Sequence, residues 1–289
     1  MAQITAALVK QLREMTDSPM MECKKALVEA DGDIEKAVDV LRKMGVAKAV
    51  KRSGRDTNEG TIAAYVSEDG KTGALLELTC ETDFVGTNPK FTGFAMDLAK
   101  AVAENDPADV VALKACAMGE GTVESELTEM IHVIGENMKV ARFQRLSVEN
   151  GVLANYVHHN GKLADIVTFS FNNAETADND EFKSFAHDVA MQVAAAAPVA
   201  ARREDVDSAV VEHEKSIYMA QAADSGKPEA IQEKIAVGKL EKFYKENVLT
   251  EQESIKESGT TINELAAKVS KSTGDDVKVV SFVRFSFGE

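Results

Sequence analysis

The stretch Gly60-Thr-Ile-Ala-Ala-Tyr-Val66 has a near copy in Gly151-Val-Leu-Ala-Asn-Tyr-Val157, which lies 91 residues further along the chain. The same offset aligns Gly70-Lys71 with Gly161-Lys162 and needs no gap. Identical residues then recur through the following segment, at Phe91, Phe94, Ala95, Asp97, Ala99, Val102 and Ala103 and at their counterparts Phe182, Phe185, Ala186, Asp188, Ala190, Val193 and Ala194. Most of these identities are turn glycines or apolar residues at the spacing of a strand or a helix. They therefore indicate an internal duplication.

Each copy predicts the same small α+β unit. An alternating strand leads to a tight turn, Glu68-Asp-Gly70 or His159-Asn-Gly161, and then to an apolar strand at 74–78 or 166–171. An amphipathic helix follows. The match resumes with an offset of 139, where Gly135, Lys139, Val140, Phe143, Arg145 and Ser147 correspond to Gly274, Lys278, Val279, Phe282, Arg284 and Ser286. We therefore expect a duplicated core of two three-stranded antiparallel sheets, each with helices packed on one face.

The longer second offset predicts about 48 extra residues in the second half, between Ala194 and Thr261. Apolar residues there step by four and three on either side of a Ser225-Gly-Lys-Pro228 turn, and the predicted seam is Val206, Val210, His213, Ile217 and Ala220 with Ile231, Ile235, Leu240 and Phe243. This pattern predicts an inserted antiparallel coiled-coil hairpin at 205–245. The sequence leaves two roles open for it: a solvated arm, or a surface covered by a partner or a second copy.

The first 55 residues predict an N-terminal three-helix bundle and a basic linker. Apolar residues repeat at helical spacing in three segments, and we expect the third helix to begin after Asp33 and to end at Gly45. From Arg42 to Arg55 all charged residues are basic, which suits either a solvated helix end and linker or a nucleic-acid arm. The arm is disfavoured because no aromatic residues are interleaved. The predicted domains are 1–55, 56–150, 151–204 with 246–289, and 205–245.

Composition narrows the classes of function. The chain has 289 residues and a formal net charge of −15, which disfavours general binding to nucleic acid or anionic lipid. Its longest apolar run, 190–201, is interrupted by Pro198 and is shorter than the roughly 18 residues that a membrane span needs. The three cysteines are far apart and never form a C-x-x-C pair, so we expect a cytoplasmic protein without a disulfide framework, a metal site or a cofactor.

The two halves differ where the second strand ends. The first half reads Thr82-Asp-Phe-Val85, whereas the second reads Asn173-Ala-Glu-Thr176. Phe84 has two interpretations: an exposed anchor for a partner on a short loop, or a plug at the top of its own core. A cysteine enzyme would use Cys80 as nucleophile with His158 or His159 as base. The repeat disfavours this class of enzyme, because Cys80 aligns with Phe171 at an apolar core position.

Five separate motifs, in order, resemble those of one family. They are Met20-Met-Glu-Cys-Lys-Lys-Ala-Leu27 with Gly32-Asp-Ile-Glu-Lys-Ala37, Thr82-Asp-Phe-Val85, Tyr156-Val-His158, Ser225-Gly-Lys-Pro228, and Phe282-Val-Arg-Phe285. With these motifs the chain resembles bacterial elongation factor Ts over nearly its whole length. The resemblance implies a ubiquitin-associated-like N-terminal bundle, a two-part core and a projecting coiled coil. It also implies a guanine-nucleotide exchange factor for elongation factor Tu, which acts by binding and not as an enzyme.

The resemblance also assigns roles to residues. It implies that Asp83-Phe84, within Thr82–Val85, inserts between helices of the GTPase domain of elongation factor Tu and disturbs its Mg²⁺ and phosphate site. It implies secondary contacts with the partner from Met20, Met21, Lys24 and His158. A homodimer or a 2:2 complex with the partner is compatible with the predicted hairpin, and we expect no membrane or nucleic-acid partner. The chain has no G-x-x-x-x-G-K-[ST] loop of its own for a nucleotide.

Overall fold

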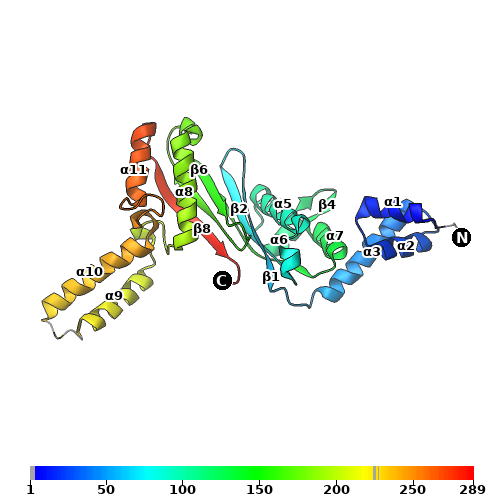
Figure 1. Cartoon of the computed structure of the whole chain (residues 1–289), viewed down its shortest axis with the longest axis horizontal. Coiled ribbons are helices and arrows are strands. Elements are labelled where there is room, and N and C mark those ends of the chain that lie inside the picture. The colour runs from blue at the N-terminus through cyan, green and yellow to red at the C-terminus, as the bar shows by residue number, and fades with distance from the viewer. Residues whose placement is uncertain (1–3, 224–225, 227) are drawn as a thin grey trace. The chain divides into compact units, whose positions relative to one another are not determined.

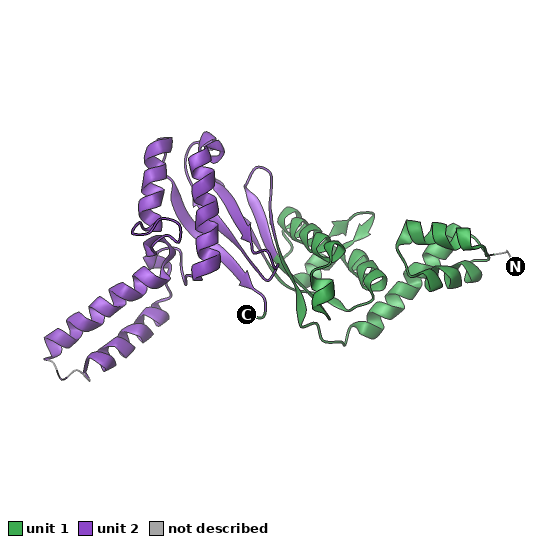
Figure 2. Ribbon diagram, in the orientation of Figure 1, with its two compact units in different colours: residues 1–63, 76–143, 288 green, residues 64–75, 144–287, 289 purple. Residues whose placement is uncertain are grey.

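The computed structural model describes residues 4–223, 226 and 228–289, so Ser225 and Lys227 of the predicted hairpin turn lie outside the described residues. The chain forms two compact units (Figure 2). Unit 1 comprises residues 1–63, 76–143 and 288, and unit 2 comprises 64–75, 144–287 and 289. Their elements are labelled in Figure 1. Among the described residues, no helix is long and apolar enough to cross a membrane.

Unit 1 begins with three helices, α1 (Ala6–Thr16), α2 (Met20–Glu29) and α3 (Ile34–Arg52). Their shared core includes Leu12, Leu27 and Leu41, and the side chain of Asp33 caps α3 by accepting the backbone N–H of Lys36. The predicted end of the third helix at Gly45 was wrong, because α3 runs on through most of the basic segment to Arg52.

Gly45 lies inside α3 for a packing reason. It is buried where α3 packs against α7 (Val123–Ile134), and a Cβ atom built on it would lie 3.3 Å from both Cβ and Cγ of His132. The glycine therefore allows close approach of two helices instead of ending one of them.

The rest of unit 1 contains a short helix, α4 (Asp83–Gly86), a long helix, α5 (Pro89–Asn105), and α6 (Val110–Ala115). A small antiparallel ladder, which the sequence did not predict, joins β3 (Ala117–Met118) to β4 (Gly121–Thr122) before α7. The three-stranded sheet has the order β1-β2-β5, with strands β1 (Glu59–Val66), β2 (Thr72–Cys80) and β5 (Met138–Ser147). Each of these strands contributes residues to both units.

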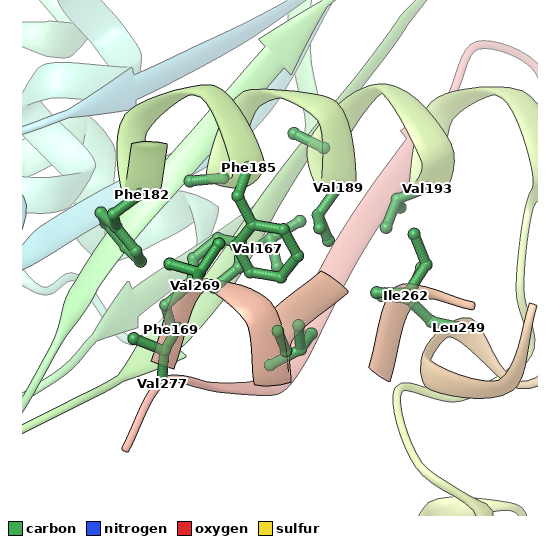
Figure 3. Close-up of a cluster of buried hydrophobic side chains, with 14 of the residues drawn as sticks. Val167, Phe169, Phe182, Phe185, Val189, Val193, Leu249, Ile262, Val269 and Val277 are labelled. Atoms are coloured by element: carbon green, nitrogen blue, oxygen red, sulfur yellow. The ribbon is translucent and has the colours of Figure 1, made fainter. Parts of the chain in front are cut away.

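Unit 2 contains the second three-stranded sheet, in the order β6-β7-β8, with strands β6 (Val152–Val157), β7 (Leu163–Ser170) and β8 (Lys278–Ser286). Both pairings are antiparallel, and Val167 lies opposite Ala154 on one side and Phe282 on the other. Helices α8 (Asp180–Ala196) and α11 (Ile262–Thr273) cover one face. Figure 3 shows their apolar side chains, such as Phe182, Phe185 and Ile262, gathered against Val167 and Phe169 of the sheet.

The elements of the two halves match at the predicted offsets, and the expected pair of three-stranded sheets is confirmed. Helices α5 and α8 have 17 residues each and begin 91 residues apart, while α7 and α11 have 12 residues each and begin 139 apart. The helix-terminating residues match as well. They are the N-caps Asn88 and Asn179, the capping boxes at Thr122 and Thr261, and the left-handed C-caps Gly135 and Gly274.

The extra residues of the second half form a two-helix arm, which we define as α9 (Ser208–Ala223) and α10 (Glu229–Asn247) packed along each other. The predicted apolar seam was only partly right: Val206, Leu240 and Phe243 contribute to the cluster at the base of the arm, but Val210 and His213 are exposed. Within the two helices the buried side chains are Ala222, Ala236 and Tyr244. Two alanines allow the helix backbones to approach closely, and the larger Tyr244 fills the base of the arm beside Val206 and Val248.

The base of the arm is closed by backbone pairing. Ala200 and Val248 form a parallel bridge, and Leu249 N–H donates to the Ala200 carbonyl at 2.9 Å. Just inside, the Arg203 guanidinium binds Glu241 at 2.9 Å and Glu251 at 2.6 Å. Two short 3-10 turns, Arg203–Asp205 and Leu249–Glu251, carry the chain into and out of the arm.

Candidate functional site

Phe84 is the most exposed of the large apolar side chains described in unit 1, with 83% of its surface exposed. It lies on the one-turn helix α4, which begins directly after β2. The alternative that it plugs its own core is therefore excluded, and the segment expected to be a short loop is helical. An exposed phenylalanine next to the carboxylate of Asp83, which is also exposed, is suited to entering an apolar pocket of another molecule.

Side chains at both ends of α4 hold its backbone in place. At the start, the Thr82 hydroxyl accepts the Val85 N–H at 3.4 Å, and the Asp83 carboxylate accepts the Phe84 N–H at 2.9 Å. At the end, the Thr87 hydroxyl donates to the Asp83 carbonyl at 3.1 Å. These bonds satisfy backbone groups that one helical turn leaves without partners.

The inner side of α4 packs against the start of β1. Gly86 is buried, and a Cβ atom built on it would lie 3.1 Å from the Gly60 carbonyl oxygen. A side chain at this position would crowd the β1 backbone, which glycine avoids. With Gly86 facing inward and Val85 half-buried, Asp83 and Phe84 are the residues of this turn that face solvent.

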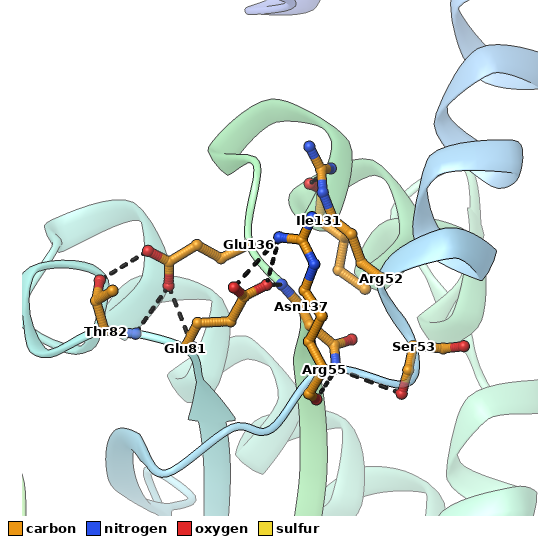
Figure 4. Close-up of polar contacts among 8 residues, drawn as sticks. All are labelled: Arg52, Ser53, Arg55, Glu81, Thr82, Ile131, Glu136 and Asn137. Atoms are coloured by element: carbon orange, nitrogen blue, oxygen red, sulfur yellow. Dashed lines mark hydrogen bonds and ion pairs between the residues drawn. The ribbon is translucent and has the colours of Figure 1, made fainter.

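A network of carboxylates holds the segment that precedes α4 (Figure 4). One oxygen of Glu136 accepts the N–H groups of Glu81 and Thr82, at 3.1 and 3.0 Å, and the other accepts the Thr82 hydroxyl at 2.7 Å. In return, the Glu81 carboxylate accepts the Asn137 N–H at 2.6 Å and the Arg55 guanidinium at 3.2 Å. The end of β2 and the start of β5 are therefore tied together from both sides.

The second half has the same kind of anchor but a different turn. Asp275, which lies 139 residues after Glu136, accepts the N–H groups of Asn172 and Asn173 and the Thr176 hydroxyl at 2.8–3.1 Å. These hydrogen bonds, with that from the Asn173 N–H first, hold the pKa of Asp275 well below its usual range. The 3-10 turn that follows, Ala174–Asp178, carries alanine and glutamate at the positions of Asp83 and Phe84.

A model of the family described as elongation factor TS matches residues 81–289, which is more than half of the chain. The chain belongs to the elongation factor Ts family. The match begins one residue before Thr82 and therefore includes the whole of α4. Family membership supports a role in translation elongation.

Curated elongation factor Ts proteins are similar over nearly the full length. The protein named Elongation factor Ts from Desulfovibrio desulfuricans is 46% identical over 286 residues, which cover 98% of each chain. Those from Clostridium kluyveri and Clostridium perfringens are 43% and 45% identical over 289 and 287 residues, covering 99% of this chain and 93% of theirs. The predicted resemblance to elongation factor Ts is thus confirmed.

The other residues that the elongation factor Ts resemblance singled out have separate environments. Met20 and Met21, at the start of α2, are 43% and 64% exposed, and Lys24 on the next turn is exposed as well. The two methionines therefore do not belong to the bundle core, which α2 enters through Cys23, Ala26 and Leu27. All three candidates lie in unit 1 together with Phe84.

His158 belongs to unit 2 and is half-buried just after β6. Its Nδ1 lies 3.2 Å from the Tyr156 hydroxyl, and its ring centroid lies 4.2 Å from that of His159. The imidazole is therefore held in place by its neighbours on the same strand end.

Cys80 is fully buried, as its alignment with the buried Phe171 predicted. Its thiol donates to the Thr82 carbonyl at 3.1 Å. The sulfur therefore faces the interior of unit 1, and its hydrogen bond helps to fix the backbone before α4. A nucleophile must reach its substrate, and this burial disfavours the cysteine-enzyme alternative. In the ranges that the structure describes, no group of three or more His, Cys, Asp or Glu residues is placed to hold a metal ion.

Three of the six basic residues in segment 42–55 have partners within unit 1. Lys48 pairs with Glu22 of α2, Arg52 donates to the Ile131 carbonyl at 3.0 Å, and Arg55 binds Glu81. Side chains that already bind groups of their own unit are not available to phosphates. This observation disfavours the nucleic-acid arm.

Glu136 is the residue that sequence reasoning missed. A signal was present, because Glu136 and Asp275 directly follow the matched helix-ending glycines Gly135 and Gly274. An acidic residue at the same place in both halves, beside a strand start, is a candidate acceptor for free backbone N–H groups.

Proposed function

We propose that this chain is a guanine-nucleotide exchange factor that binds elongation factor Tu in its GDP-bound form and promotes GDP release. The observation that carries the proposal is Phe84, which is almost fully exposed on a turn that only the first half possesses. Membership of the elongation factor Ts family supports it. The chain acts by binding, with no covalent step and no cofactor or metal of its own, in the cytoplasm where elongation takes place.

The mechanism follows from differential binding. Asp83 and Phe84 insert between helices of the partner's GTPase domain and displace its Mg²⁺ and phosphate-binding groups. A phenylalanine that leaves water buries about 150–250 Å² and, as a central anchor, contributes about 2 kcal/mol or more to binding. Because coupling between two ligands is reciprocal, a coupling of about 3 kcal/mol weakens GDP and the exchange factor by the same factor, about 150-fold.

Secondary contacts with the partner come from each unit separately. Met20, Met21 and Lys24 form an exposed patch at the start of α2 that we assign to the partner, and His158 supplies a contact from unit 2. The first 55 residues act as a ubiquitin-associated-like module, the core arose by duplication, and the two-helix arm is a coiled coil. The arm serves the partner or a second copy of the chain, which gives a homodimer or a 2:2 complex.

Stopped-flow release of a fluorescent GDP analogue from elongation factor Tu tests the proposal. Wild-type protein should accelerate release, and Phe84→Ala should reduce that acceleration by about 30-fold, the equivalent of about 2 kcal/mol. Val111→Ala is the matched control, because Val111 is 77% exposed on α6 of the same unit. No acceleration by wild type overturns the function, and an unimpaired Phe84→Ala overturns the assigned site.

A further inference from the structure

We propose that Glu136 is a positioning residue for nucleotide exchange, because its carboxylate presets the turn that presents Asp83 and Phe84. This inference rests on the proposed exchange function. Glu136 does not belong to α4 and lies 54 residues after Thr82 along the chain. It nevertheless accepts three hydrogen bonds from the two residues that lead into α4.

The turn needs such a holder because α4 is only four residues long. Helix formation has a costly nucleus, and one isolated turn does not persist in water by its own backbone bonds. The Thr82 cap is itself long, with 3.4 Å between the hydroxyl oxygen and the Val85 nitrogen. The order of α4 therefore has to come from groups outside it.

Glu136 supplies that order in two ways. Two N–H donors on one carboxylate oxygen fix the backbone direction at Glu81 and Thr82. The other oxygen takes the single hydroxyl proton of Thr82, which leaves the lone pairs of that hydroxyl for the Val85 N–H. Glu136 thus sets both the entry angle of the chain and the polarity of its cap.

The anchor is itself held from the opposite side. The neighbouring Asn137 donates its backbone N–H to Glu81 and its side-chain amide to the Arg55 carbonyl at 2.8 Å. Arg55 closes the circle through its guanidinium, 3.2 and 3.3 Å from the two oxygens of Glu81 (Figure 4). The bonds to the Glu81 carboxylate are charge-assisted, so they are stronger than those of neutral pairs.

The second half provides an internal comparison. Asp275 anchors the turn after Asn173 in the same way, although that turn presents no phenylalanine. The carboxylate anchor therefore belongs to the scaffold in both halves. Only in the first half does the anchored turn present a phenylalanine to the partner. Loss of either anchor should disturb its local turn, but only loss of Glu136 should disturb exchange.

The expected effect is on apparent affinity. If Glu136→Gln leaves the turn in its competent arrangement for one tenth of the time, the concentration of exchange factor needed for half-maximal GDP release rises about 10-fold. The maximal release rate at saturation should stay near that of wild type, because binding restores the competent turn. Phe84→Ala, in contrast, removes the group that acts on the partner and lowers the maximal rate as well.

The test uses full-length variants in the same stopped-flow assay over a range of exchange-factor concentrations. Glu136→Gln should show the 10-fold rise, and Asp275→Asn, the matched control, should leave the titration unchanged. Glu136→Asp places the second half's carboxylate in the first half and should restore part of the affinity. In the Phe84→Ala background, Glu136→Gln should add little, because it acts through Phe84.

Three outcomes in this assay overturn the proposal: an unchanged titration for Glu136→Gln, equal losses for Glu136→Gln and Asp275→Asn, or a full Glu136→Gln effect on top of Phe84→Ala. A readout without the partner separates this failure from failure of the proposed function. Amide hydrogen exchange at Thr82 and Val85 should be faster in Glu136→Gln, with the amides of Asn173 and Thr176 unaffected. Unchanged protection of Thr82 and Val85 refutes positioning, whether or not the wild type accelerates GDP release.

Discussion

Gly45 offers a sharp test of how α3 packs against α7. In the interior of an exposed helix, replacement of glycine by alanine stabilises the fold by about 1 kcal/mol, because alanine has the higher helix propensity. At Gly45 the new methyl group would lie 3.3 Å from Cβ and Cγ of His132, a side chain that is fully buried. Neither atom is the far end of a flexible chain, so α7 itself would have to move.

The two effects oppose each other. Overpacking of a close contact costs about 1–3 kcal/mol, which exceeds or cancels the gain in helix propensity. We therefore expect Gly45→Ala to change the free energy of unfolding by between zero and a loss of about 2 kcal/mol. Gly93 of α5 is the matched control, since a Cβ atom built there meets nothing within 4 Å. Gly93→Ala should stabilise the protein by about 1 kcal/mol.

Urea unfolding followed by far-ultraviolet circular dichroism measures both variants against wild type. Because the m-value scales with the surface exposed on unfolding, equal slopes allow the midpoints to be compared directly. The reasoning is refuted if Gly45→Ala stabilises the protein as much as Gly93→Ala does. That result would mean that α7 moves away from α3 at no cost.

Three further predictions concern titration and the arm. Burial lowers the pKa of His132, against an opposing effect of Glu22, so His132 contributes stability that is present above its unfolded pKa of about 6.5 and is lost as the pH falls below it. Urea midpoints of His132→Gln should therefore fall less than those of wild type between pH 7.5 and 5.5, and parallel profiles would contradict this. Burial raises the pKa of Asp165 to about 8 in spite of Arg284, so this carboxyl takes up a proton on folding and its contribution is lost as the pH rises from about 4 through 8. Asp165→Asn should therefore gain stability relative to wild type between pH 6 and 9, and a constant difference would refute the assignment. Replacing residues 212–239 by a short Gly-Ser linker should leave both sheets folded, as judged by circular dichroism and melting temperature. Deletion of 206–243 should lower the melting temperature further, because it removes Val206 from the cluster at the base of the arm.

The sequence predicted the duplicated architecture well because the signals involved are local. Cap residues, turn glycines and apolar spacing act within a few residues, so the same signals produced helices of equal length in α5 and α8. The end predicted for α3 failed for the opposite reason. A glycine ends a helix or allows close packing, and at Gly45 the deciding residue is His132, 87 residues further along the chain.

The candidate site was predicted in its residues but not in its support. The sequence identified Asp83 and Phe84 as unrepeated, yet it left exposure and burial of Phe84 open. Exposure depends on Gly86 meeting Gly60 and on Glu136 holding Thr82, which are contacts across the fold that no local pattern encodes. The seam of the arm was predicted only in part: Val206 packs at the base as expected, but the predicted seam did not include Tyr244, which is buried beside it.

The closed base of the two-helix arm determines how the arm is attached to the rest of unit 2. The chain leaves the core at Ala200 and returns to pair with it at Val248. The arm is therefore attached to the core at one place and does not separate two parts of it. Lengthening or shortening both helices together would leave the ends at the base in the same place. The length of the arm can therefore change by whole helical turns, in evolution or by engineering, while the β6-β7-β8 sheet of the same unit keeps its geometry.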